Sequence, residues 1–255
     1  MFMTTLLPVC HILPHADADG PSNMATDEAL LEAVAHDPSV AYFRTYGWTE
    51  PTLSLGYFQT LSEALSDPRW REVALVRRPT GGGAIWHDRE ITYALAVPRD
   101  HPLSRQSKVL YQAVHGAIAA LLDETGVSAR RRGEAGASDP RTPRPFLCFT
   151  DCDAEDLVLG TAKVVGSAQR RRAGAVLQHG SLLLARSPHT PELPGVAELA
   201  SASDPPRRWA ERLASRVPVA IGFRTQAVDW PPGFVSLAAS IAENFYRNPS
   251  WTSRR

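Results

Sequence analysis

Lys163 is the residue whose surroundings point most clearly to chemistry, because it lies in a strand-like apolar stretch (AKVV, residues 162–165). β-Strands favour β-branched and aromatic side chains, so a lysine there contributes little to packing. If its ammonium points into a pocket, it can bind an anion or polarise a carbonyl oxygen. It can also favour the thiolate of a nearby cysteine such as Cys148, because opposite charge stabilises the ionised form. An outward-facing strand lysine is the plainer alternative.

The composition makes this lysine more unusual. Of the 27 basic residues, 25 are arginines, and only Lys108 and Lys163 are lysines. A sequence that uses arginine almost everywhere indicates that a retained lysine needs an amine rather than merely a positive charge.

A glycine-rich segment, residues 77–88 (RRPTGGGAIWHD), follows a short apolar strand. Consecutive glycines let the backbone approach a ligand and present N–H groups to it, and two arginines before them can bind a carboxylate or phosphate. The segment has neither the Lys-Ser/Thr of a P-loop nor the GxGxxG spacing of dinucleotide-binding proteins. A flexible hairpin loop is the alternative. The candidate ligand-binding residues here are Arg77, Arg78, Gly81, Gly82, Gly83 and His87.

Two later segments contain further residues at which a ligand could come close to the main chain. They are residues 166–168 (GSA) and 178–181 (QHGS). A glycine in mid-strand, as at Gly180, suggests a bulge or a ligand close to the backbone. His179 fits a neutral core histidine as well as a functional one. The candidates from both segments are Gly166, Ser167, Ala168, His179 and Gly180.

The overall composition is that of an ordinary globular protein. The 255 residues carry a net charge of zero, which gives no global field toward nucleic acid or an anionic membrane. No stretch approaches the ~18–20 apolar residues of a membrane span. Three cysteines, Cys10, Cys148 and Cys152, are too few for a disulfide scaffold, and a reducing cytoplasmic compartment fits them better. Without a second cysteine pair, no metal site is expected.

Short apolar strands and amphipathic helices alternate along the chain, and they must position these residues. The fold class expected is α+β or α/β, as a single domain over residues 1–255 with a core at about 23–251 and a surface loop at about 128–146. Helix 109–122 is expected to bury Val109, Ala113, Ile118 and Leu122. Strands are expected at 41–44, 52–55, 74–77, 91–97, 157–159, 163–165 and 176–184, and the other helices at 27–35 (beginning near Ser22 or Asn23), 61–72, 207–216 and 233–246.

Six ordered motifs, with a seventh segment at the end, resemble the lipoate–protein ligase superfamily, which also includes biotin ligases and octanoyltransferases. The resemblance covers nearly the whole chain and implies an α+β catalytic domain with a central mixed sheet flanked by helices. The motifs are residues 23–29 (NMATDEA), 44–48 (RTYGW) with Pro51, 53–59 (LSLGYFQ), 77–88, 163–170 (KVVGSAQR) and 177–184 (LQHGSLLL), and the seventh segment is 242–251 (AENFYRNPSW).

Within the superfamily, the form of the early motifs and Leu-Cys-Phe at 147–149 are similar to the cysteine-dependent octanoyltransferases. This resemblance implies that an acyl chain passes from acyl carrier protein to Cys148 and then to the lysine of a lipoyl domain. Acceptors would be 2-oxoacid dehydrogenase E2 subunits or the glycine-cleavage H protein. It also implies that Cys148 and Lys163 are catalytic, and the 15 residues between them suit a loop-to-strand return to one pocket. Thioester exchange implies no cofactor.

One departure supports an alternative. Three consecutive glycines at 81–83 resemble the ATP-using ligases, whereas octanoyltransferases of this group often carry a bulkier third residue. An ATP- and magnesium-dependent lipoate–protein ligase would act through lipoyl-AMP, with the glycine loop around the acyl-adenylate and Lys163 in contact with it. Cys148 would then be incidental. A protein that only binds acyl or lipoyl groups is disfavoured, because the glycines, Cys148 and Lys163 are all intact.

Overall fold

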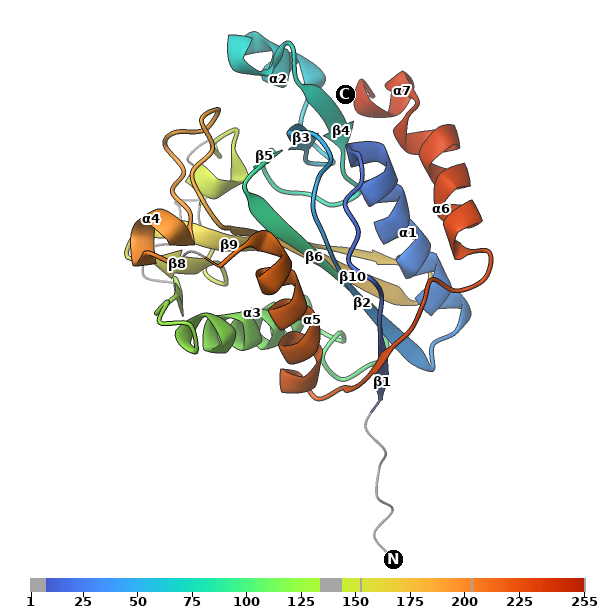
Figure 1. Cartoon of the computed structure of the whole chain (residues 1–255). Coiled ribbons are helices and arrows are strands. Elements are labelled where there is room, and N and C mark those ends of the chain that lie inside the picture. Colours follow the sequence, from blue (N-terminus) through green and yellow to red (C-terminus); the bar gives the residue numbers. More distant parts are fainter. Residues whose placement is uncertain (1–7, 134–143, 152, 203, 255) are drawn as a thin grey trace, which may run out of the picture.

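A computed structural model describes residues 8–133, 144–151, 153–202 and 204–254 of the chain (Figure 1). The surface loop expected at 128–146 lies mostly outside the described residues, and so does Cys152. In the described part of the chain, no helix is long and apolar enough to cross a bilayer.

An eight-stranded sheet forms the centre of the fold, with the strand order β11-β1-β2-β6-β10-β9-β8-β7. Strand β1 pairs in parallel with β2 and β11, while the other neighbours pair antiparallel, so the mixed sheet expected from the sequence is confirmed. The strands are β1 (Val9–Ile12), β2 (Val40–Tyr46), β6 (Glu90–Pro98), β7 (Arg130–Arg131), β8 (Leu157–Leu159), β9 (Ala162–Arg172), β10 (Ala175–Leu183) and β11 (Arg224–Ala227).

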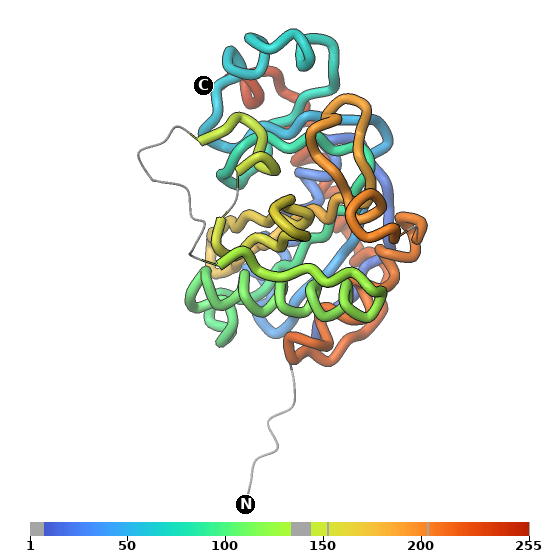
Figure 2. Tube along the Cα trace, turned by 90° about the vertical axis from the view of Figure 1, so that its left-hand side faces the viewer, coloured from blue at the N-terminus to red at the C-terminus, as the bar shows by residue number. Residues whose placement is uncertain are grey.

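A smaller sheet carries the glycine-rich segment. It has the order β4-β3-β5, with β4 (Ala74–Arg77) parallel to β3 (Thr52–Leu55) and β5 (Ile85–His87) antiparallel to it. The glycines therefore connect β4 to β5. This sheet lies at the end of the molecule that also holds α2 (Leu61–Ser66) and the C-terminus (Figures 1 and 2).

Helices cover both faces of the large sheet (Figure 1). Alternate residues of a strand point to opposite faces, so Ala94 of β6 packs with α1 (Gly20–His36), while Tyr93 and Leu95 pack with α3 (Ser107–Asp123) and α5 (Pro206–Ala220). The remaining helices are α4 (Val196–Ala200), α6 (Phe234–Ile241), which packs on α1, and α7 (Pro249–Thr252).

Helix α1 begins earlier than the sequence suggested. Asp19 is the N-cap, and its side chain accepts a hydrogen bond from the Ser22 amide. Pro21 fits the first turn because its missing N–H would have no partner there. Asn23, expected near the cap, is buried instead, and its amide donates to the carbonyls of Ala18 and Gly47.

Candidate active site

The structure brings Cys148 and Lys163 together. Lys163 lies near the start of β9, and its Nζ is 3.4 Å from Cys148 Sγ and 3.1 Å from the Cys148 carbonyl oxygen. Cys148 itself begins a short 3-10 turn, Cys148–Thr150. The contact is the loop-to-strand return that the 15-residue spacing suggested.

Lys163 is held as an ammonium group. Its Nζ forms an ion pair with Asp156 Oδ2 at 2.8 Å and lies 5.1 Å from the centre of the Phe149 ring. Burial opposes the charged form, but the interactions of Nζ with Cys148 and with the Asp156 carboxylate outweigh it, so the pKa of Lys163 lies above its usual value. A protonated Lys163 can stabilise a thiolate or an oxyanion, and it cannot accept a proton.

The segment carrying Cys148 packs backbone against backbone on the glycine loop. The Ala84 amide donates to the Phe146 carbonyl at 2.7 Å, and the Cys148 amide donates to the Ala84 carbonyl at 2.8 Å. A Cβ atom built on Gly83 would lie 2.9 Å from both Cys148 N and Phe146 O. The glycine at 83 therefore has a packing reason that is independent of any nucleotide.

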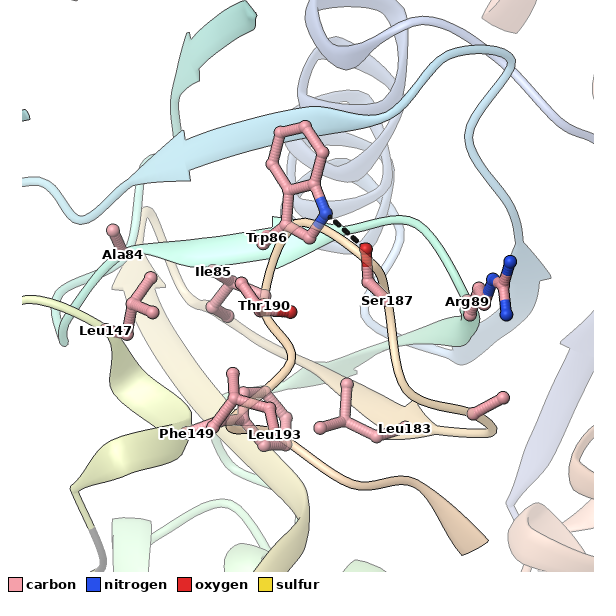
Figure 3. Close-up of a pocket in the computed structure, with 11 residues that line it drawn as sticks. Ala84, Ile85, Trp86, Arg89, Leu147, Phe149, Leu183, Ser187, Thr190 and Leu193 are labelled. Atoms are coloured by element: carbon pink, nitrogen blue, oxygen red, sulfur yellow. Dashed lines mark hydrogen bonds between the residues drawn. The ribbon is translucent and has the colours of Figure 1, made fainter. Parts of the chain in front are cut away.

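Apolar packing also holds the segment that carries Cys148. Leu147 and Phe149, which flank Cys148, are buried and line a pocket together with Trp86 and Leu193 (Figure 3). The half-buried cysteine between them directs its thiol toward Lys163.

Cys148 lies on a wall shared by two cavities. The inner pocket has apolar and small residues such as Met24 and Ile85, whereas the outer cleft has acidic ones such as Asp153 and Asp156. Residues lining both are Gly81, Gly82, Cys148, Ser167 and Ala168. The inner pocket is further lined by Met24, Tyr46, Ser54, Arg78, Ile85, His87, Thr92, Gly166, His179, Gly180 and Ser181, and the outer cleft by Gly83, Tyr111, Arg144, Pro145, Asp151, Asp153, Glu155, Asp156, Lys163 and Gln169.

Every residue that the sequence nominated lines one of these cavities, with the exception of Arg77. Its guanidinium is buried and donates to the carbonyls of Gly56 at 2.9 Å, Gln59 at 2.6 Å and Thr252 at 2.7 Å. The structure therefore corrects the prediction that Arg77 contacts the substrate. Its guanidinium instead joins the C-terminal end of the chain to the small sheet.

Arg78 differs from its neighbour because it lines the inner pocket while holding the glycine loop. Its Nη2 donates to the carbonyls of Gly81 at 2.9 Å and Gly83 at 2.6 Å, and its Nη1 donates to that of Ser54 at 3.0 Å. Burial lowers the pKa of Arg78 to about 10. Between these anchored carbonyls, Gly82 adopts φ +96°, a left-handed conformation that glycine accepts readily.

Two buried histidines join the inner pocket to the surrounding sheets. His87 Nδ1 is 2.6 Å from Glu90 Oε1, and its Nε2 is 2.8 Å from Ser54 Oγ. His179 Nδ1 is 2.8 Å from Asp27 Oδ2, and its Nε2 is 2.7 Å from Thr80 Oγ1. Both hydroxyl groups are themselves buried, so these arrangements fix the pocket wall.

Sequence reasoning missed His115, which lies on the face of α3 that packs against the sheet. Its Nε2 is 2.6 Å from Ser167 Oγ, and the same hydroxyl is 2.6 Å from the Tyr93 hydroxyl. Gly180 leaves room for these two hydroxyl groups to meet, because a Cβ atom at position 180 would collide with Ser167 Oγ and Tyr93 Cε1. The β9–β10 register runs unbroken through Gly180, so the bulge considered for this glycine is absent.

Comparisons with known proteins identify the family. The model of the lipoyl protein ligase A/B catalytic domain family matches residues 19–192. The octanoyltransferase LipM of Symbiobacterium thermophilum is 41% identical over 171 residues, which are 65% of this chain and 61% of that protein. The enzyme of the same name from Anoxybacillus flavithermus is 39% identical over 168 residues, 64% of this chain and 60% of the relative. The matches thus span about three fifths of these relatives' length.

A solved structure extends the likeness in fold. The bipartite lipoate protein ligase from Thermoplasma acidophilum, described with its E2 lipoyl domain, superposes with a TM-score of 0.72 at 17% identity. The superposition covers 97% of this chain and 96% of the other. The α+β architecture expected from the sequence is therefore confirmed.

Proposed function

Because this chain belongs to the lipoyl protein ligase A/B catalytic domain family, we propose that it is an octanoyltransferase acting through a thioester on Cys148. The octanoyl group comes from acyl carrier protein and goes to the lysine of a lipoyl domain. The observation that carries the proposal is the 3.4 Å contact between Cys148 Sγ and Lys163 Nζ on the wall shared by both cavities. The relatives' shared name, octanoyltransferase, supports the choice of reaction.

The first step needs a thiolate. A free cysteine thiol is only a few per cent ionised at pH 7, and the thiolate is the nucleophile. The Lys163 ammonium stabilises negative charge on Sγ, and Asp156 keeps the ammonium in place at 2.8 Å. Cys148 then attacks the donor's carbonyl carbon, and the carrier's thiolate leaves.

The two cavities suit the two parts of an acyl thioester. We place the apolar chain in the inner pocket, beside Met24, Ile85 and the glycines, while Arg78 of the same lining directs its guanidinium to main-chain carbonyls. The carbonyl would lie at the shared wall, where Lys163 and main-chain N–H groups of the glycine loop can stabilise an oxyanion. One thioester replaces another of similar energy, so this step needs no ATP.

The second step transfers the acyl group to an amine. A lysine side chain approaching through the outer cleft meets the carboxylates of Asp153, Glu155 and Asp156, whose charge attracts its ammonium form. The ammonium loses one proton to solvent, and the neutral amine attacks the thioester carbonyl carbon. Amide formation then makes the second step favourable. The acceptors proposed are lipoyl domains of E2 subunits or the glycine-cleavage H protein. The Thermoplasma ligase is described with an E2 lipoyl domain, which supports this acceptor class.

A side-by-side assay tests the proposal against the ATP-dependent ligase. Octanoyl-carrier protein without ATP is compared with free lipoate plus ATP and magnesium, each with a lipoyl domain as acceptor. We expect modification in the first reaction only, with an octanoyl mass increment on Cys148 as intermediate. Modification only in the second, or an increment only on Cys152, contradicts the proposal.

A further inference from the structure

Aminolysis of a thioester requires a group that accepts a proton. After an amine attacks the carbonyl carbon, the tetrahedral intermediate carries a protonated nitrogen. Expulsion of neutral amine then competes with expulsion of thiolate, unless the nitrogen first loses a proton. With Cys148 free, Lys163 is an ammonium paired with Asp156 at 2.8 Å, so a second proton acceptor beside the thioester would serve this step.

Ser167 and His115 form a chain of groups suited to this task. Ser167 lines both cavities beside Cys148, and its Oγ is 2.6 Å from His115 Nε2. His115 is 1% exposed, so its only described outlet toward the cleft is through that hydroxyl.

The direction of each hydrogen bond follows from the partners. The Glu155 carbonyl can only accept, so the His115 nitrogen 2.5 Å from it, Nδ1, carries the proton. Nε2 is then the acceptor and takes the hydrogen of Ser167 Oγ. Tyr93 in turn donates to Ser167 Oγ at 2.6 Å, while Gln178 donates to the Tyr93 hydroxyl at 3.3 Å.

This arrangement leaves Ser167 ready to receive a proton from the cleft. Its own hydrogen points at His115 and its oxygen keeps acceptor capacity toward the cavity. Burial lowers the pKa of His115, although the Glu155 carbonyl and nearby Asp156 oppose that effect, so the imidazole is neutral at pH 7 and its Nε2 lone pair is available.

We propose that Ser167 and His115 form a proton relay that serves the amine-transfer step. The inference rests on the proposed function. The C–N bond forms, the nitrogen gives one proton to Ser167 Oγ, and Ser167 gives its own proton to His115 Nε2. The C–S bond then breaks, leaving the amide, the Cys148 thiolate beside Lys163, and a His115 imidazolium that returns its proton to solvent through Ser167.

The relay predicts an asymmetry between acceptors. Transfer from octanoyl-Cys148 to a thiol starts from the acceptor's thiolate, which ionises in solution, and its tetrahedral intermediate has no proton to lose, so it does not need His115. Transfer to a lysine amine does. A merely structural role for His115 would slow both transfers together, because both use the same acyl-enzyme.

The experiment starts from acyl-enzyme made with octanoyl-carrier protein and purified. Single-turnover deacylation is followed by intact mass with a lipoyl domain or, separately, with pantetheine as a thiol acceptor. The variants are His115→Gln, whose amide nitrogen cannot accept a proton, and Ser167→Ala. His101→Gln is the matched control, since His101 is a half-buried histidine outside both cavities.

We expect each relay variant to slow amine transfer about 100-fold, in the range of general acid–base catalysis. His115→Gln, at a residue that lines neither cavity, should change thiol transfer less than about threefold. The double variant should be no slower than either single one, because the two groups act as a unit. Equal slowing of both transfers, or no slowing of amine transfer, overturns the relay and leaves the proposed function standing. If the wild-type protein forms no octanoyl-Cys148, it is the proposed function that fails.

Discussion

Gly83 and Cys148 are packed so closely that a Cβ atom at position 83 would lie 2.9 Å from the Cys148 main-chain nitrogen. The glycine loop thereby sets the position of the thiol. The packing of the Cys148 segment therefore accounts for the third glycine without reference to the acyl donor.

Gly83→Ala should therefore displace the Cys148 segment from Lys163. We expect the rate of octanoyl-Cys148 formation to fall at least about tenfold, measured by intact mass. Gly116→Ala is the matched control: nothing lies within 4 Å of a Cβ there, and replacing a helical glycine stabilises by roughly 0.5–1 kcal/mol. Equal acylation rates in wild type and Gly83→Ala would show that this contact does not position the thiol.

Cys148→Ala should abolish acyl transfer and leave the fold intact, because the half-buried thiol is not part of the hydrophobic core. Thermal unfolding and the mass assay check the two halves of this expectation. Full transfer activity in this variant would refute the cysteine mechanism and favour the ligase.

Lys163→Arg keeps the charge but replaces a compact ammonium with a planar guanidinium. The space around Nζ is small, since a Cβ on Gly166 would already lie 2.9 Å from it. We expect a fall in acyl transfer of about 100-fold or more. Lys108→Arg, a change at a largely exposed lysine, provides the control and should leave the rate unchanged. Unaltered turnover of Lys163→Arg would mean that the amine is not needed.

Arg77→Ala should act on stability, because it removes a buried guanidinium that binds main-chain carbonyls near both Gly56 and Thr252. Leaving such acceptors without donors costs about 3 kcal/mol or more of unfolding free energy. Urea unfolding measures the loss, with the exposed Arg207→Ala as control. A stable variant with weakened substrate binding would restore the role first expected for Arg77.

Acid should destabilise the protein in two stages. Burial lowers the pKa of His87 and of His115 below the usual histidine value of 6.5, so the unfolded chain binds these protons more readily. Their contribution to stability is present above pH 6.5 and is lost as the pH falls below it. For Asp27 and Glu90, burial raises the pKa, but their ion-pair and hydrogen-bond partners lower it by more, so the net pKa lies below its usual value. Their contribution to folding stability is therefore lost only below about pH 4.

Urea unfolding between pH 7.5 and 5 tests the first stage. His115→Gln should have a shallower pH dependence than wild type across that range, whatever its stability at pH 7.5. Identical slopes would show that His115 is not held neutral in the folded protein.

The sequence predicted those parts of the site whose residues are unusual for their local context. Lys163 stands out in an apolar strand of a lysine-poor chain, and the glycines stand out after β4. Strands β3 and β4 were predicted at their observed bounds because apolar residues end there at turn residues. The start of α1 was missed because Asp19 caps it four residues before Asn23.

His115 was missed for a different reason. The periodicity of α3 correctly predicted burial of Ile118 and Leu122, but the structure buries Leu110 and Val114 where Val109 and Ala113 were expected. His115 lies three residues before Ile118, on the same stripe, so a titratable residue on an apolar helix face was a usable signal. Its partner Ser167 lies 52 residues away, and only the folded sheet brings the two together.

The short turn at residues 153–156 has a consequence for how this site can vary. Its Asp156 carboxylate binds Lys163, and its Glu155 carbonyl binds His115. The Asp153 amide donates to Asp156 at 2.6 Å, so the turn moves as one piece. A substitution that shifts this turn therefore displaces both the Lys163 ammonium and the His115 imidazole. Variation on these two sides of the cysteine is therefore expected to be epistatic, with a change on one side tolerated only alongside a compensating change on the other.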